Sequence, residues 1–204
     1  MTANDPFQRY DETDDARFYV QPRLVNHIDD AAIAATTKLY RTYLPAAGAI
    51  LDLMSSWVSH LPADVSYSRV AGLGMNETEL RSNPRLTEYV VQDLNRVPQL
   101  PYAEASFDGG MVTVSVQYLT NPVAVYRDVA RVLRPGAPFL TVFSNRMFPT
   151  KAVAIWQSLD DPGHQQLVRT YYAQTDLFDR IDVLDCSPGR WSDPLYAVIG
   201  YRKA

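Results

Sequence analysis

The chain has few of the residues on which several classes of protein depend. Its 204 residues include one cysteine, Cys186, so an internal disulfide framework is impossible and a cytoplasmic setting is expected. The 3 histidines stand far apart without metal-ligand spacing, so we expect no metal site. No apolar run approaches the roughly 20 residues of a membrane helix, and the polar stretch Met1–Arg9 predicts no signal peptide.

An excess of positive charge is also missing. Lys and Arg number 19 against 23 Asp and Glu, a net charge of −4, so the whole chain gives nucleic-acid binding no electrostatic support. The composition, with 47% hydrophobic and 21% charged residues, is that of a globular protein. Without a repeat or a low-complexity linker, the chain is expected to form a single domain with a sizeable core.

Short apolar runs alternate with helical stretches along the chain. Strands are expected at residues 49–51, 68–74, 86–92, 111–116, 138–144, 181–185 and 195–201. Helices are expected at about 31–43, 77–83, 123–133, 151–159 and 165–173. Alternating strands and helices form a parallel sheet, whereas two late strands joined without a helix pair antiparallel. The pattern predicts an α/β fold, a doubly wound Rossmann-like seven-stranded sheet with its last strands antiparallel and an N-terminal helical cover.

Asp52 ends the first expected strand and precedes the loop at residues 54–60. Ligands of parallel sheets bind outside the carboxyl ends of the strands, so a ligand is expected beside this loop. A loop that a nucleotide approaches closely is rich in glycine, yet this one contains none. Asp52 can anchor a cation there or cap a following helix. Ser55 and Ser56 can donate to a carboxylate or a ribose, or cap a helix that starts at Trp57.

Trp57 has three interpretations. Its indole can fill the space that glycines would leave, stack on an adenine or substrate ring, or lie buried in the core. His60, in the same loop, can be a base or a structural residue, and His164 is expected on the surface.

Residues 92–144 carry an ordered set of motifs. Asp93 follows the third strand, Leu100-Pro101 and Ser106-Phe107-Asp108 come next, and Arg-Val-Leu-Arg-Pro-Gly occupies residues 131–136. This order resembles that of class I S-adenosylmethionine-dependent methyltransferases of the small-molecule type. The likeness of fold extends over about residues 44–203. The whole string is also similar to a methyltransferase type 11-like branch with a degenerate glycine loop.

The resemblance implies a methyltransferase-like domain at residues 44–204, preceded by a cover or lid at residues 1–43. It implies methyl transfer from S-adenosylmethionine to a small-molecule substrate, with neither nucleic acid nor membrane as partner. Two departures favour a different reading, a non-catalytic protein of this fold that binds another ligand or a protein partner. The family's Asp-x-Gly-x-Gly-x-Gly loop reads Asp52-Leu53-Met54-Ser55-Ser56-Trp57 here. The acid that holds the ribose hydroxyls in the family is replaced by Gly74.

The resemblance also implies roles for individual residues. Asp93 and Leu94 match the adenine contact, and Asn76 matches a serine that caps a helix. The expected cofactor-binding residues are Asp52, Met54, Ser55, Gly74, Met75, Asp93, Leu94 and Ser115. The expected substrate residues are Arg23, Gln117, Asn145 and Arg146. The catalytic candidates are His27, as a general base, and Tyr118, and either can instead be structural.

The substrate side of the site is expected between two segments. Residues 18–30 and 144–146 should face each other over the carboxyl edge of the sheet, because no face of the sheet is reserved for a helix before the first strand. Arg146 can pair with a substrate carboxylate or phosphate, or with Asp29 or Asp30. Together with Arg23 it favours an anionic substrate under a mobile lid.

Overall fold

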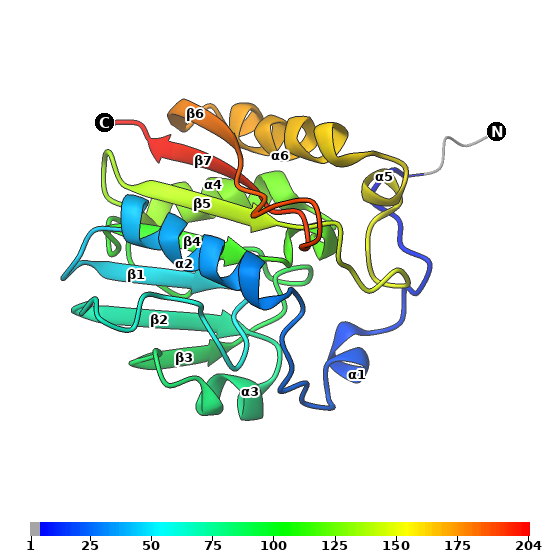
Figure 1. Cartoon of the computed structure of the whole chain (residues 1–204), viewed down its shortest axis with the longest axis horizontal. Helices are drawn as coiled ribbons and strands as arrows, with labels where there is room; N and C mark the ends of the chain where they lie inside the picture. Colours follow the sequence, from blue (N-terminus) through cyan, green and yellow to red (C-terminus); the bar gives the residue numbers. More distant parts are fainter. Residues whose placement is uncertain (1–4) are drawn as a thin grey trace.

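The computed structural model describes residues 5–204, which form a sheet of order β3-β2-β1-β4-β5-β7-β6 (Figure 1). Strands β1 to β5 run parallel, and β7 pairs antiparallel with both β5 and β6. The seven strands and their antiparallel end confirm the predicted fold class. The strands are β1 (Ala49–Leu53), β2 (Arg69–Gly74), β3 (Glu88–Val91), β4 (Gly109–Thr113), β5 (Pro138–Phe143), β6 (Phe178–Asp185) and β7 (Tyr196–Arg202). The first four residues of the expected cover lie outside the described residues.

Polar side chains cap the starts of α2 and α3. Asp29 accepts from the Ala32 amide at 2.9 Å, and Asn76 accepts from the Glu79 amide at 3.1 Å. Pro162 was expected in a break but lies in the first turn of the last helix, because proline is favoured there and Asp160 caps that turn. The helices are α1 (Asp15–Phe18), α2 (Asp30–Tyr43), α3 (Glu77–Ser82), α4 (Pro122–Val132), α5 (Ala154–Gln157), α6 (Asp161–Thr175) and the 3-10 helix η1 (Val116–Tyr118).

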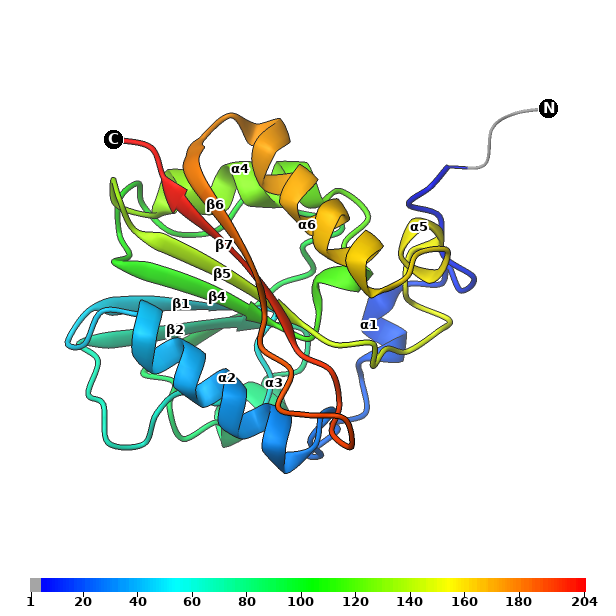
Figure 2. The same ribbon diagram turned by 45° about the horizontal axis from the view of Figure 1, so that its top comes forward.

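Helices cover both faces of the sheet (Figure 2). On one face, Leu39 and Tyr40 of α2 share a buried cluster with Met111 and other strand residues. On the other face, α4 and α6 pack through Val129 and Tyr172 in a second cluster. The expectation that no face is reserved for the helix before β1 is therefore wrong. Burial of its apolar side positions α2 against the sheet, and only the segment before it reaches the carboxyl edge.

The segment between β1 and β2, residues 54–68, contains no helix. The expectation that Ser55 or Ser56 caps a helix starting at Trp57 is therefore wrong. Hydrogen bonds to its neighbours hold this segment in an irregular path. The Ser55 amide donates to the Leu73 carbonyl at 2.7 Å, and the Thr37 hydroxyl of α2 donates to the His60 carbonyl at 2.9 Å.

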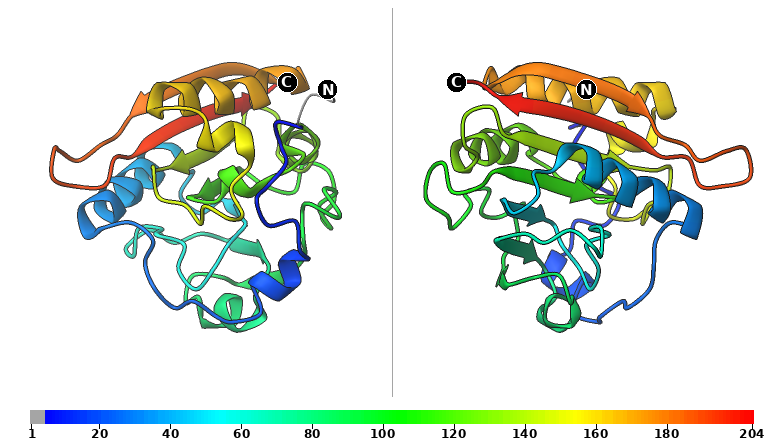
Figure 3. Two further views of the ribbon diagram at one scale, coloured as in Figure 1. Left: turned by 90° about the vertical axis from the view of Figure 1, so that its right-hand side faces the viewer. Right: turned by 60° about the vertical axis from the view of Figure 1, so that its left-hand side comes forward.

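The loop that joins β6 to β7 reaches the start of α2 (Figure 3). Asp29 accepts there from the Asp193 amide at 2.7 Å and from the Ser192 hydroxyl at 2.8 Å. These bonds fix the point where the N-terminal segment turns into α2. Among residues 5–204, no helix combines the length and the apolar character needed to cross a bilayer.

Candidate functional site

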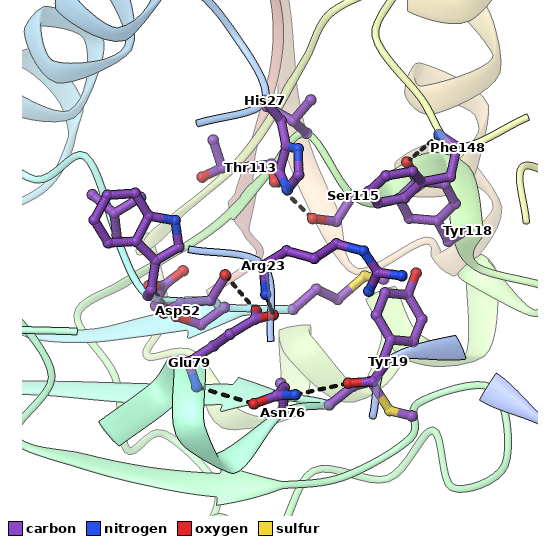
Figure 4. A pocket seen from close by; sticks show the side chains of 18 of the residues that line it. Tyr19, Arg23, His27, Asp52, Asn76, Glu79, Thr113, Ser115, Tyr118 and Phe148 are labelled. Carbon is purple, nitrogen blue, oxygen red and sulfur yellow. Dashed lines mark hydrogen bonds between the residues drawn. The ribbon is translucent and has the colours of Figure 1, made fainter. Parts of the chain in front are cut away.

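A cleft of about 520 Å³ opens at the carboxyl edge of the sheet. Its floor comes from the ends of β1, β2 and β4, where Asp52, Gly74 and Thr113 lie. The segment between α1 and α2 closes one side and contributes Arg23 and His27 (Figure 4). The other expected residues that line the cleft are Met54, Ser55, Met75, Asp93, Leu94, Ser115, Tyr118 and Arg146.

Two residues at strand ends beside the cleft have left-handed backbones. Met54, at the position of the first glycine of the family's loop, has φ of 53°, and Val114 after β4 has φ of 51°. Positive φ is uncommon for residues other than glycine, and for a β-branched residue it is an outlier. Such strain gathers at ligand-binding sites, where the surrounding structure maintains it. Met54 therefore keeps the turn that a glycine would make, but with a side chain.

Asp52 is buried at the end of β1, with 3% of its surface exposed. It accepts hydrogen bonds from the Ser55 hydroxyl at 2.7 Å and the Ser59 hydroxyl at 2.5 Å. The Ser59 oxygen accepts in turn from the Asn83 amide at 2.8 Å. Burial raises the pKa of Asp52 to about 7, against the two hydroxyl bonds that lower it. Asp52 therefore faces the cleft and does not cap a helix.

Gly74 lies against the loop that follows β1. A Cβ atom at this position would come within 2.2 Å of the Ser55 carbonyl oxygen. The loop carbonyl thus fills the space that a side chain at the end of β2 would need. This close approach explains why glycine stands at a position where the family has an acid.

Glu79, in the first turn of α3, is a cleft residue that the sequence analysis missed. Its Oε1 accepts from the Arg23 backbone amide at 2.7 Å, and its Oε2 accepts from the Ser56 hydroxyl at 2.6 Å. Asn76, three residues earlier, also donates to the Tyr19 carbonyl at 2.8 Å. The spacing of Asn76 and Glu79 is that of a helix capping box, which marks a side chain turned back toward the preceding loop. That spacing was the available signal.

Aromatic side chains hold the N-terminal segment against the residues after β5. The Arg23 guanidinium lies 4.5 Å from the Phe18 ring centre and 5.3 Å from that of Phe148. The His27 ring centre lies 5.4 Å from that of Phe148. Arg23 and His27 therefore meet Phe148, which lies two residues beyond the segment 144–146 that was expected to face residues 18–30.

Trp57 is partly exposed, so the interpretation as a buried core residue is wrong. Its indole nitrogen donates to the Val25 carbonyl at 3.0 Å, and the residue lines the cleft. Because Trp57 stands beside the cleft, its fluorescence can report on a ligand there.

The expected substrate residues are only partly brought together. Arg146 borders the cleft but pairs with Asp193 at 2.6 Å, and not with Asp29 or Asp30. Gln117 is fully buried and donates to the Val114 carbonyl at 3.0 Å, while Asn145 is exposed, and neither lines the cleft. The backbone bends directly after β4 and after β5, and these bends direct the side chains of Gln117 and Asn145 away from the cleft.

Asp93, Leu94 and Ser115 stand at strand ends on the cleft wall. Asp93 Oδ1 accepts from the Asn95 amide at 2.9 Å, which fixes a turn after β3. Ser115 donates its hydroxyl to the Thr113 carbonyl at 2.7 Å. Leu94 is buried and presents an apolar surface beside Asp93.

The side chains considered for catalysis differ in their protonation state at neutral pH. Burial lowers the pKa of His27 below its ordinary value and that of His60 to about 4, so both rings are neutral at neutral pH. Burial raises the pKa of Tyr118, whose hydroxyl oxygen accepts from the Phe148 amide at 2.8 Å. His164, expected on the surface, is 5% exposed and stacks on Trp156 with ring centres 4.1 Å apart, because α6 packs on α5.

A family model described as a methyltransferase domain matches residues 54–141. Methyltransferase phqN of Penicillium fellutanum is 33% identical over 78 residues, 35% of this chain and 24% of that protein. The biotin biosynthesis bifunctional protein BioHC of Teredinibacter turnerae is 27% identical over 81 residues, 39% of this chain and 14% of that protein. The matches thus span less than a quarter of the length of either curated relative.

Solved structures share the fold at low identity. The S-adenosylmethionine-dependent methyltransferase from Mesorhizobium loti has a TM-score of 0.58 at 17% identity, over 82% of this chain and 98% of that one. A putative one from Listeria monocytogenes has a TM-score of 0.60 at 12% identity, over 84% and 99%. A chain in the complex of the Haloferax volcanii Trm112 methyltransferase activator with a putative methyltransferase has a TM-score of 0.60 at 15% identity, over 83% and 89%.

These structural likenesses show the same architecture, and the domain match begins directly after β1, covers β2 to β4 and reaches into β5. The motifs at Asp93 and at residues 131–136 lie within that match. Residues 54–141 therefore match a methyltransferase domain, and the chain has the fold of S-adenosylmethionine-dependent methyltransferases of known structure.

Proposed function

We propose that this chain transfers a methyl group from S-adenosylmethionine to a small molecule bound in the cleft. The observation that carries the proposal is the meeting of Asp52, Asp93 and Arg23 in one cleft, at the sheet edge where ligands of this fold bind. Two of these groups come from strand ends, and the third comes from the segment that closes the cleft. This arrangement offers separate places for a cofactor and for an acceptor.

The cleft residues fit the cofactor in most of its parts. A volume of about 520 Å³ lies within the roughly 300–1,000 Å³ of small-molecule sites. Asp52 would hold the ammonium of the amino-acid end, and Asp93 with Leu94 would hold the adenine. Met54 and Ser55 would border the amino-acid end, Met75 the adenine, and Ser115 the wall toward the acceptor. The ribose contact departs from the family because the Ser55 carbonyl fills the space beside Gly74.

Two arginines, Arg23 and Arg146, line the acceptor side of the cleft. Among residues 5–204, Arg23 forms no ion pair, and its guanidinium donates to the Phe18 carbonyl at 3.0 Å. Arg146 is neutralised by Asp193. We therefore assign recognition of an anionic acceptor to Arg23, because an unpaired guanidinium binds carboxylate or phosphate through two parallel hydrogen bonds.

Methyl transfer mainly requires that the protein position the acceptor against the methyl group. S-adenosylmethionine supplies an electrophilic methyl group, so the protein needs a base only when the acceptor carries a proton. His27 lines the cleft beside Arg23 and is neutral at neutral pH, so it can take that proton. Tyr118 is protonated at the same pH and can donate a hydrogen bond to the acceptor.

Calorimetric titration with S-adenosylmethionine and S-adenosylhomocysteine tests the proposal. Binding should also change tryptophan fluorescence, since Trp57 lines the cleft while Trp156 is 1% and Trp191 94% exposed. We expect Trp57→Phe to abolish the fluorescence change and Trp191→Phe to retain it. If millimolar cofactor produces no heat of binding and no fluorescence change, the result would support the alternative, a non-catalytic protein that binds another ligand or a protein partner.

Release of S-adenosylhomocysteine with panels of carboxylates, phosphates and neutral amines tests the acceptor class. Arg23→Gln should raise KM for an anionic acceptor about 10- to 100-fold through loss of a charged hydrogen-bond donor. Arg17→Gln, an exposed change in the neighbouring helix, is the matched control. Equal KM values for the two variants, or turnover of neutral amines alone, would remove Arg23 from the acceptor site.

A further inference from the structure

The wall of the cleft beside β2 lacks the carboxylate that the family places at the end of this strand. Gly74 has no side chain, and the Ser55 carbonyl oxygen blocks any that could be added there, at 2.2 Å from a Cβ atom. A ribose bound along this wall would therefore find no charged acceptor at the strand end.

Glu79 offers a carboxylate on the α3 side of this gap. It lies in the first turn of α3, which follows β2 directly, and it lines the cleft. Its Oε2 accepts from the hydroxyl of Ser56, the residue after the one whose carbonyl blocks Gly74. Figure 4 shows its side chain reaching from α3 toward the middle of the cleft, between Asp52 and Arg23.

The hydrogen bonds of Glu79 leave it capacity for a ligand. A carboxylate offers about four acceptor sites. The protein uses one at Oε1, from the Arg23 amide, and one at Oε2, from the Ser56 hydroxyl. No ion pair among residues 5–204 includes Glu79, so no cationic side chain neutralises it.

Two oxygens that each retain a free lone pair match the two neighbouring hydroxyls of a ribose. Hydrogen bonds from hydroxyls to a carboxylate are charge-assisted and about twice as strong as neutral ones. The existing bonds to Arg23 and Ser56 would hold the carboxylate in place while it accepts them. A ribose bound there would also fasten the N-terminal segment, through Arg23, over the occupied cleft.

We propose that Glu79 accepts hydrogen bonds from the cofactor's ribose hydroxyls, in place of the acid that Gly74 cannot supply. The inference rests on the proposed function, because it presumes that S-adenosylmethionine binds in this cleft. It differs from a purely structural role, in which Glu79 only joins the N-terminal segment to the loop after β1.

The test is a cycle of two ligands and two proteins, measured by calorimetric titration. The ligands are S-adenosylhomocysteine and its 2′,3′-dideoxy analogue, and the proteins are the wild type and Glu79→Gln. We expect Glu79→Gln to weaken S-adenosylhomocysteine about 10- to 100-fold and the dideoxy analogue by about twofold at most. Glu77→Gln is the matched control, because Glu77 lies in the same turn of α3 but pairs with Arg81 on the surface.

The outcomes distinguish failure of the Glu79 inference from failure of the proposed function. If Glu79→Gln weakens both ligands equally, Glu79 acts only through the N-terminal segment and the inference is overturned. If it weakens neither, the inference is also overturned. If the wild type binds neither ligand, the proposed function itself fails. Should Glu79→Gln not fold, Glu79→Asp keeps the charge but withdraws it by one methylene, and the same selective loss for the ribose ligand is required.

Discussion

Single residues at the ends of β1 and β2 explain how this chain departs from the methyltransferases that it resembles. Met54 keeps a left-handed backbone, with φ of 53°, although it has a side chain. The next residue, Ser55, donates its hydroxyl to Asp52 and lays its carbonyl against Gly74. The departure at position 74 therefore follows from the path of the loop that begins at Met54, because the Ser55 carbonyl leaves no room for a side chain there.

We expect Gly74→Asp to fail as a repair of the ribose acid. Its Cβ would overlap the Ser55 carbonyl, so the loop must shift, which should lower the free energy of unfolding by about 1–3 kcal/mol. Urea denaturation measures this loss, and titration should show weaker binding of S-adenosylhomocysteine.

Gly136→Ala is the control for that substitution. Gly136 has φ of 77° and open space around it, so alanine there carries a conformational cost of about 1–2 kcal/mol without altering the cleft. Its binding of S-adenosylhomocysteine should equal that of the wild type. A Gly74→Asp protein as stable as the wild type that binds more tightly would show that the loop moves freely, contrary to this account.

The segment between α1 and α2 combines an irregular backbone with exposed apolar side chains. Its residues 19–29 contain no helix or strand, and Val20, Leu24 and Val25 are at least half exposed. Its ends are fixed, at one side by the ion pair of buried Lys151 with Asp15 at 3.0 Å and at the other by the start of α2. A segment with few buried contacts between fixed ends opens at low free energy.

We expect hydrogen exchange at residues 19–28 to be fast without ligand and slower with S-adenosylhomocysteine, while β5 exchanges slowly in both. Asn76→Asp sharpens the experiment, because aspartate still caps α3 but cannot donate to the Tyr19 carbonyl. This variant should exchange faster in the segment than the wild type, with little change in α3. Equal exchange with and without ligand would mean that the segment is fixed structure and not a lid.

For the molecule as a whole, the sequence predicts the architecture better than the site. The parallel part of the sheet follows from the alternation of short apolar runs with helices, and Asp29 and Asn76 cap helices because their hydrogen bonds reach only neighbouring residues. Strand ends are less predictable. The strand β4 stops at Thr113 because Val114 turns into the left-handed region, which no apolar pattern indicates.

The site depends on contacts between distant parts of the chain. Asp52 and Asp93 were predictable because parallel strands end at one edge. The roles of Ser59 and Asn83 were not, because the loop that brings them together has no periodic pattern. Arg146 likewise finds its partner, Asp193, 47 residues away in the loop before β7.

The burial of Asp52 should make the free energy of unfolding depend on pH. Folded Asp52 keeps its proton up to about pH 7, whereas the unfolded chain releases it near the ordinary pKa of 3.8. The folded state therefore binds more protons in this window, and the contribution of Asp52 to stability falls as pH rises from about 4 to 7. His60 opposes it, because its folded pKa of about 4 lies below 6.5, so its contribution is lost as pH falls through that range.

Substitution separates these two opposed contributions. Asp52→Asn should gain stability relative to the wild type as pH rises from 4 to 7, by up to about 1.4 kcal/mol for each pH unit. His60→Gln should gain relative to the wild type as pH falls from 6.5 to 4. Urea denaturation of the three proteins at pH 4, 5.5 and 7 gives both differences. If the difference for Asp52→Asn is the same at every pH, Asp52 ionises as it does in water, and the floor of the cleft is open to solvent beneath the loop.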